Sequence, residues 1–118
     1  MKLSVAIQDY LIEAEVRKYT PKTIKGKKTN LGLFLRFCED VAGITEIEND
    51  SPAVVREFTR YMVERGRKGT YINGLLKNIK AFIQYCFEEG YGGFNTNNRF
   101  KWCREETPVI MVYRPGTV

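Results

Sequence analysis

Residues 67–85 read RKGTYINGLLKNIKAFIQY, and this stretch lies in the most regular hydrophobic pattern of the chain. Large apolar side chains recur there three or four residues apart, as one face of an α-helix requires. They are Ile72, Leu75, Leu76, Ile79, Phe82, Ile83, Cys86 and Phe87. We therefore predict a long helix that begins around Gly69 and Thr70, ends at Glu89 and Gly90, and buries this face.

The opposite face of this predicted helix carries amides and lysines. Four residues at i, i+4, i+7 and i+11 form one stripe: Asn73, Lys77, Lys80 and Gln84. Amide groups pair with base edges and ammonium groups with phosphates. Thr70, at the helix start, adds a hydroxyl beside free backbone N–H groups, which favours a phosphate. The stripe predicts a nucleic-acid contact; a solvated helix surface is the alternative.

Three more helices are predicted upstream. The first covers residues 4–19, with Ser4 as its N-cap. Its expected buried face consists of apolar residues at helical spacing: Val5, Leu11, Ile12 and Val16.

The second predicted helix begins with Thr20 and Pro21, an N-cap followed by proline at the first helical position. It continues to about Gly43. Gly26 and Gly32 interrupt it, and each costs about 1 kcal/mol relative to alanine. Glycine inside a helix permits close approach by another backbone, although it can equally be neutral.

The third predicted helix repeats the device of cap plus proline at Ser51 and Pro52. Its apolar residues form the expected buried stripe: Val54, Val55, Phe58, Tyr61 and Met62. It ends at Gly66, where a left-handed residue closes a helix.

Beyond Gly90 the helical pattern stops. Clusters of glycine and asparagine are followed by a short β-prone run at residues 109–113, and no helix is predicted there. The chain is therefore expected to contain an all-α domain over residues 1–92. Residues 93–118 are expected to form a linker tail.

The net charge of +5 is distributed unevenly. Two windows, residues 17–30 and 65–85, contain no acidic residue. Their cations are Arg17, Lys18, Lys22, Lys25, Lys27 and Lys28 in the first and Arg65, Arg67, Lys68, Lys77 and Lys80 in the second. Two basic windows in a small domain indicate a surface for a polyanion, whereas a solvated lysine-rich surface is the plainer interpretation.

Composition argues against several classes of protein. There is no histidine, and the three cysteines form no C-x-x-C pair, so we expect neither a metal site nor a cofactor. No apolar run approaches the roughly 20 residues that span a bilayer. Acidic residues interrupt the apolar N-terminal stretch, which is unlike a signal peptide. We therefore expect a cytoplasmic protein.

In order along the chain, three segments resemble the core-binding domain of tyrosine recombinases, the phage integrases. They read TPKTIKGKKTNLGLFLRFCED (20–40), SPAVVREFTRYMVERG (51–66) and RKGTYINGLLKNIKAFIQYCFEEGY (67–91). The family has T-x-x-T-I-x-x-x-x-x-x-L-x-x-F, then V-x-x-F-x-x-Y-x-x-x-R-G, then T-x-x-N-x-x-L-x-x-I/L-K-x-F-x-x-Y-x-x-x-x-G-Y. The spacing is kept over residues 20–91. The stretch WCREETPVIMVY (102–113) is similar to the family's connection into its catalytic domain, as in integrases of conjugative elements.

The resemblance implies a four-helix, SAM-like bundle that forms half of a clamp around duplex DNA during DNA integration and recombination. In the family the second and fourth helices face the grooves beside the strand-exchange point. Carried over, this places Lys22, Thr23, Lys25, Lys27 and Lys28 on one DNA-facing helix and Thr70, Asn73, Lys77 and Lys80 on the other, with Arg67 and Lys68 just before it. The implied partners are double-stranded DNA, a C-terminal catalytic domain of the same protein and other protomers in a synaptic complex.

The family's chemistry requires an arginine-, lysine- and histidine-rich pocket and a nucleophilic tyrosine in a later domain. This sequence has no histidine, and only five residues follow Tyr113. We therefore expect this chain to be the non-catalytic part and not to cleave DNA alone. Its tyrosines are expected to serve in packing.

Two other functions remain open from the sequence. One is a helical module that binds proteins and has an incidental basic face. The other is a dimeric helix-turn-helix regulator, although the helices predicted around the turn at ERGRKGT (64–70) are longer than such motifs use. DNA binding by both windows requires residues 25–28 and 73–80 to face the same side of the molecule.

Overall fold

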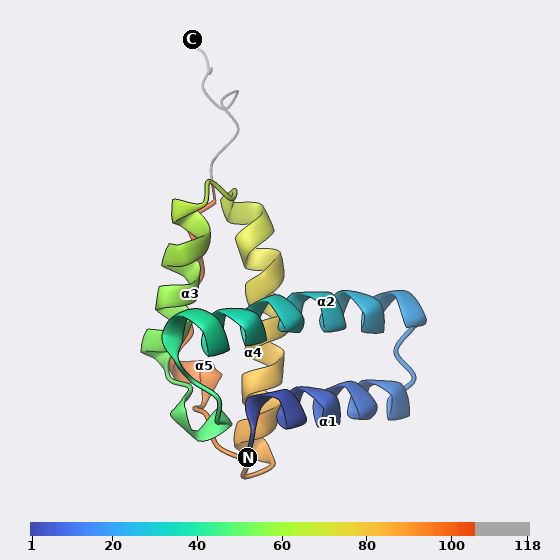
Figure 1. Ribbon diagram of the computed structural model, residues 1–118. Helices are drawn as coiled ribbons and strands as arrows, with labels where there is room; N and C mark the ends of the chain where they lie inside the picture. Colours follow the sequence, from blue (N-terminus) through green and yellow to red (C-terminus); the bar gives the residue numbers. More distant parts are fainter. Residues whose placement is uncertain (106–118) are drawn as a thin grey trace.

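Four long helices form two antiparallel hairpins in the computed structural model, which describes residues 1–105 apart from the side chains of residues 98 and 99. The first hairpin consists of α1 (Leu3–Val16) and α2 (Pro21–Phe37), the second of α3 (Pro52–Glu64) and α4 (Gly69–Glu88). The first hairpin crosses one face of the second, and its free end projects beyond α4 (Figure 1). The predicted all-α bundle is confirmed.

Three short elements connect or follow these helices. The π-helical turn η1 (Cys38–Ala42) continues α2, the 3₁₀ turn η2 (Ile47–Asn49) precedes α3, and α5 (Thr96–Arg99) follows α4. Our prediction of no helix beyond Gly90 is therefore wrong at α5. A four-residue helix has no hydrophobic period to detect. The β-prone run at residues 109–113 lies outside the described residues.

Capping residues set the helix limits where the sequence placed them. The Thr20 hydroxyl accepts a hydrogen bond from the Thr23 N–H (3.2 Å), and the Ser51 hydroxyl accepts one from the Val54 N–H (3.4 Å). Gly66 closes the α3 end with a positive φ of 78°. At these positions the prediction is confirmed because caps depend on local chemistry alone.

The buried face of α1 differs from our prediction. The structure buries Leu3, Ala6, Ile7, Tyr10 and Ala14. By contrast, Val5, Ile12 and Val16 are 47%, 57% and 69% exposed. Both sets recur at helical spacing, and the true set contains two alanines that a search for large apolar residues overlooks. Packing against α2 and α4 buries the face that contains the two alanines, because small residues let the helices approach closely.

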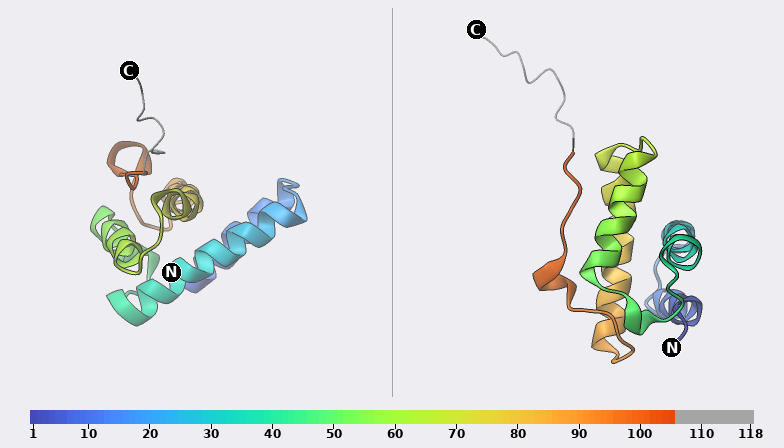
Figure 2. Two further views of the ribbon diagram at one scale, coloured as in Figure 1. Left: turned by 90° about the horizontal axis from the view of Figure 1, so that it is seen from above. Right: turned by 60° about the vertical axis from the view of Figure 1, so that its left-hand side comes forward.

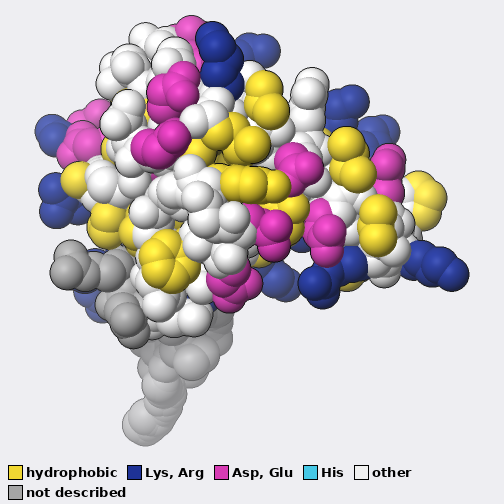
Figure 3. Space-filling view, turned by 90° about the horizontal axis from the view of Figure 1, so that it is seen from below, with side chains coloured by type: hydrophobic (Ala, Val, Ile, Leu, Met, Phe, Trp, Pro, Cys, Tyr) yellow, Lys and Arg dark blue, Asp and Glu magenta, His cyan; other side chains and the backbone are white. Residues whose placement is uncertain are grey.

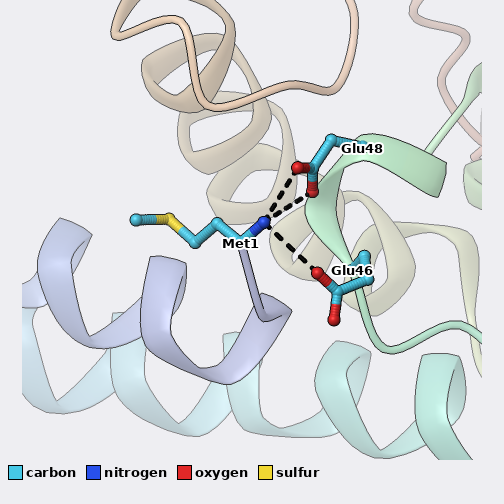
Figure 4. A network of polar contacts seen from close by, with 3 residues as sticks. All are labelled: Met1, Glu46 and Glu48. Atoms are coloured by element: carbon cyan, nitrogen blue, oxygen red, sulfur yellow. Dashed lines mark hydrogen bonds and ion pairs between the residues drawn. The ribbon is translucent and has the colours of Figure 1, made fainter.

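Contacts with residues 45–48 hold the start of α1. The helix begins at Leu3 rather than at the predicted cap Ser4, and its own N-cap residue, Lys2, makes no side-chain cap bond. Instead the Leu3 N–H donates to the Thr45 carbonyl (2.8 Å). The Met1 ammonium lies 2.8 Å from Glu48 and 3.2 Å from Glu46 (Figure 4). These carboxylates raise the pKa of the amine, and the amine lowers that of Glu48.

Aromatic side chains join the two hairpins in the core. Phe58 of α3 meets Phe34 and Phe37 of α2 edge to face, with ring centroids 5.4 and 5.3 Å apart. Tyr10 of α1 packs on Phe82 of α4 in the same way, at 5.7 Å. Edge-to-face pairs fix the hairpin crossing because they restrict ring orientation as well as burying area.

The chain beyond α4 returns along the second hairpin on the side opposite the first (Figure 2). The side chain of Gln84 holds the start of α5: its amide oxygen accepts from the Thr96 N–H (2.8 Å) and hydroxyl (2.9 Å). Phe100 and Cys103 are partly buried against the core. Residues 93–105, which we expected to be a linker, therefore pack on the bundle.

Candidate nucleic-acid interface

A groove of about 990 Å³ runs between α1, α4 and the returning chain. From α4 it is lined by Asn73, Lys77, Lys80, Ala81, Gln84, Tyr85 and Glu88. The predicted stripe therefore lies along one wall of the groove. From α1 and the turn after it come Tyr10, Glu13, Ala14, Arg17 and Tyr19.

Lys27 of α2 contacts two residues of the same groove. Its ammonium donates to the Tyr10 hydroxyl (3.0 Å) and lies 5.2 and 5.3 Å from the ring centroids of Tyr10 and Tyr19. Both tyrosines line the groove. One lysine of the first basic window thus lies against two tyrosines of the groove that Lys77 and Lys80 of the second window also line.

The other cations of the second helix lie elsewhere. Lys25 and Lys28 line a separate hollow between the ends of α1 and α2, beside Tyr19. Lys22 is exposed in the first turn of α2. Lys25 is two residues from Lys27, about 200° around the helix, so it faces away from the groove. The structure divides the window that we expected to act as one surface.

Thr23 is engaged in capping. Its hydroxyl accepts a hydrogen bond from the Thr20 hydroxyl (2.9 Å), whose oxygen also caps the Thr23 backbone. The side chain is exposed near the free end of the hairpin. Its local role explains its position without a ligand.

Asn73 contacts the chain beyond α5 rather than open solvent. Its amide oxygen accepts from the Cys103 N–H (2.8 Å), and its amide nitrogen donates to the Cys103 carbonyl (2.8 Å) and to a Glu105 carboxylate oxygen (2.8 Å). In this conformation the amide that we expected to contact a base is occupied. No sequence period shows this, because the partner lies 30 residues away.

The start of α4 carries the remaining predicted residues. Lys68 and Thr70 are exposed there, and the α4 N-terminus has no side-chain cap. The Arg67 guanidinium lies 5.6 Å from the Tyr71 ring centroid. Arg67 also lines a hollow with two arginines from other helices, Arg36 of α2 and Arg65 after α3.

Arg17 and Arg36 were not among our predicted site residues. Arg17 is the last cation before the turn that joins α1 to α2, and it lies in the groove although it pairs with Glu13 (2.8 Å). Arg36 lies i+11 from Lys25, so both share the outer face of α2. The sequence shows that spacing. Arg36 was nevertheless left out of the predicted site, because several apolar residues separate it from the acid-free window at residues 17–30.

Charge compensation differs between lysines and arginines. Within residues 1–105, no lysine ammonium lies within 4.0 Å of a described carboxylate; the ion pairs found there involve Met1, Arg17 and Arg60. Figure 3 shows lysine and arginine side chains at the free end of the first hairpin, and acidic side chains both beside them and across the rest of this face. The lysines therefore keep their charge available for an anion.

Tyrosines near the groove serve as hydrogen-bond donors. The hydroxyls of Tyr85 and Tyr91 both donate to one carboxylate oxygen of Asp9 (2.8 Å each). Burial first, and then the hydrogen bond to Asp9, raises the pKa of Tyr85; the hydrogen bond to Asp9 raises that of Tyr91. A raised pKa disfavours the phenolate, so these two groups are suited to packing rather than to attack on an electrophile.

Metal-ligating clusters and membrane-spanning helices are both absent from the described part of the chain. Residues 1–105 contain no group of three or more cysteine, aspartate or glutamate side chains placed to hold a metal ion. None of the described helices combines the length and hydropathy needed to cross a bilayer.

Comparison of the chain with protein-family models, curated proteins and solved structures finds no match in any of the three.

Proposed function

We propose that this chain is the DNA-binding, core-binding domain of a tyrosine-type site-specific recombinase. The observation that carries the proposal is the approach of Lys27 from α2 to the groove that Lys77 and Lys80 line from α4. The resemblance of residues 20–91 to that family supplies the class of DNA transaction. In this proposal the domain grips duplex DNA in the cytoplasm, and a separate catalytic domain breaks and rejoins the strands.

Uncompensated lysines suit a phosphate backbone for a thermodynamic reason. Each ammonium that meets a phosphate releases condensed counterions, and that release drives association. A lysine already paired with a carboxylate would first have to give up its partner. Because no described lysine has such a partner, none incurs that cost.

Further predicted DNA-contacting residues, all of them cations except Thr70, have a secondary place in this proposal. Lys22, Lys25 and Lys28 surround the free end of the first hairpin, and Arg67, Lys68 and Thr70 surround the start of α4. Duplex DNA carries a charge about every 1.7 Å along its axis, so long side chains at both places can reach phosphates flanking the groove.

Titration with labelled duplex DNA at several salt concentrations tests the proposal. We expect a Kd of about 10⁻⁴ to 10⁻⁶ M, typical of non-specific binding, and a log K that falls linearly with log salt. Lys77→Ala and Lys80→Ala should each reduce the salt slope by about one contact. Lys2→Ala removes an equal charge at the start of α1 and should leave the slope unchanged. Equal slopes in all four proteins would contradict the proposal.

A protein-binding module is the second candidate, and the exposed face of α1 favours it. Val5, Ile12 and Val16 leave an apolar ridge uncovered on that helix. Absence of DNA binding at low salt, together with self-association or capture of a partner that Ile12→Lys abolishes, would support this alternative. The helix-turn-helix alternative is not favoured, because α3 and α4 lie side by side and antiparallel (Figure 1).

A further inference from the structure

The side chain of Asn73 holds the segment after α5 on the wall of the groove by pairing with its backbone, as another strand would. The carboxamide of Asn73 both accepts from the N–H and donates to the carbonyl of Cys103 (2.8 Å each). This is the pattern by which one strand pairs with another, supplied here by a helix. Because both hydrogen bonds go to the main chain of Cys103, they do not depend on the side chain at that position.

The start of α4 is shaped to let this segment pass. A Cβ added to Gly69 would lie 2.4 Å from the Arg104 carbonyl oxygen and 2.9 Å from the Glu105 Cα. Both atoms are backbone, so no rotamer change relieves the clash. Gly74, on the same helix, has nothing within 4 Å of such a Cβ. The sequence left open whether Gly26 and Gly32 permit close approach or are neutral; both face open space, and Gly69 is the helical glycine where close approach occurs.

Glu105 brings a negative charge to the basic groove. Its carboxylate accepts from the Asn73 amide (2.8 Å), and it lines the groove together with Lys77 and Lys80. A carboxylate there is held where the proposed function requires a phosphate. Trp102 and Cys103, from the same segment, also line the groove.

We propose that residues 100–105 form a strap that docks on α4 and competes with DNA for this groove. The strap occupies the Asn73 amide and places Glu105 in the groove that Lys77 and Lys80 line, although not within 4.0 Å of their ammonium groups, so DNA must displace the strap to enter the groove. This inference rests on the proposed function and adds a regulatory step to it: the same surface alternates between an acidic segment of its own chain and a nucleic acid.

Gly69→Ala in the full 118-residue chain tests the strap without altering any proposed DNA contact. The single tryptophan, Trp102, lies in the strap and lines the groove beside α4, so its fluorescence anisotropy reports release. We expect Gly69→Ala to lower that anisotropy and to tighten DNA binding about tenfold, because a few modest hydrogen bonds no longer have to be broken. Gly74→Ala, the matched control, should leave both signals unchanged.

Glu105→Gln tests the negative charge of the strap separately from the docking of the strap on α4. It removes the negative charge, and we expect tighter DNA binding by up to about fivefold, the range of an exposed charge interaction. Glu89→Gln removes an equal charge at the far end of α4 and should not alter affinity. The effect of Glu105→Gln should shrink as salt rises.

The outcomes distinguish the two proposals. A released strap with unchanged DNA affinity would refute competition while leaving the DNA-binding function in place. Unchanged anisotropy in Gly69→Ala would refute the docking itself. If no variant binds DNA at any salt concentration, the proposed function fails, whatever the anisotropy shows.

Discussion

The two hairpins of this molecule differ in how completely they are packed. In the α3–α4 hairpin the apolar stripe predicted for α4 is buried except at Phe87, and eight residues of that helix are buried. The α1–α2 hairpin is packed only where it crosses the other, and its free end extends beyond α4 (Figure 1). Burial stabilises the α3–α4 hairpin, whereas the α1–α2 hairpin leaves surface free for partners. The partly covered hairpin carries Lys27 and the exposed apolar residues of α1, whereas Lys77 and Lys80 lie on the well-packed α4.

The largest expected effect lies at the crossing of the hairpins. Phe58→Ala should reduce the free energy of unfolding by about 3–5 kcal/mol, because Phe58 is fully buried between Phe34 and Phe37. Ile12→Ala, on the uncovered side of α1, should change it by less than about 0.5 kcal/mol. Urea denaturation followed by circular dichroism measures both. A large loss in Ile12→Ala would mean that the α1 ridge is covered in solution.

A buried carboxyl beside the hairpin crossing should make stability depend on pH. Asp50 is 4% exposed, its Oδ2 has no hydrogen-bond partner among the described residues, and burial raises its pKa to about 7. Between its ordinary pKa near 4 and about 7 the folded protein holds an extra proton, so stability should fall as pH rises through this window. The expected loss is of the order of 2–4 kcal/mol.

Asp50→Asn provides the control for that pH dependence. It keeps the shape of the side chain and removes the titration, so the fall in stability between about pH 4 and 7 should be largely abolished. Thermal denaturation at a series of pH values measures this. An unchanged profile in the variant would assign the pH dependence to other groups.

Loss of a helix cap should lower global stability by about 1 kcal/mol in the packed part of the molecule and by much less at the free end. Ser51→Ala removes the cap of α3, which begins beside the core, and should lower global stability by about that amount. Thr20→Ala removes the equivalent cap of α2 at the free end, where residues 20–23 are exposed. There we expect faster amide hydrogen exchange in the first turn and little global loss. Equal global losses would show that the free end folds cooperatively with the core.

The smallest expected effects come from two open glycines of α2. A Cβ at Gly26 or Gly32 meets nothing within 4 Å, so alanine should gain helix propensity at no steric cost, by about 0.5–1 kcal/mol. Gly32 lies beside buried Leu31 and should give the full gain, whereas Gly26 lies in the free half and should give less. Gly43→Ala is the contrasting control, because its φ of +70° should make alanine destabilising.

Local chemistry made much of the fold predictable. The α4 stripe, the caps at Thr20 and Ser51 and the left-handed Gly66 all depend on residues within a few positions of one another. The buried face of α1 was not predictable in this way, because two helical faces competed and contacts with α2 and α4 selected one. The candidate site was predicted in part, since Lys77 and Lys80 line the groove together.

The sequence by itself determined that four long helices form, that Thr20 and Ser51 cap two of them and that two stretches carry cations without acids, because each property depends on neighbouring residues. Only the tertiary structure decided that Lys27 turns toward the groove while Lys25 turns away, and that the Asn73 amide binds the backbone of Cys103. Such pairings join residues far apart in the chain, and the packing of the two hairpins determines which of them meet.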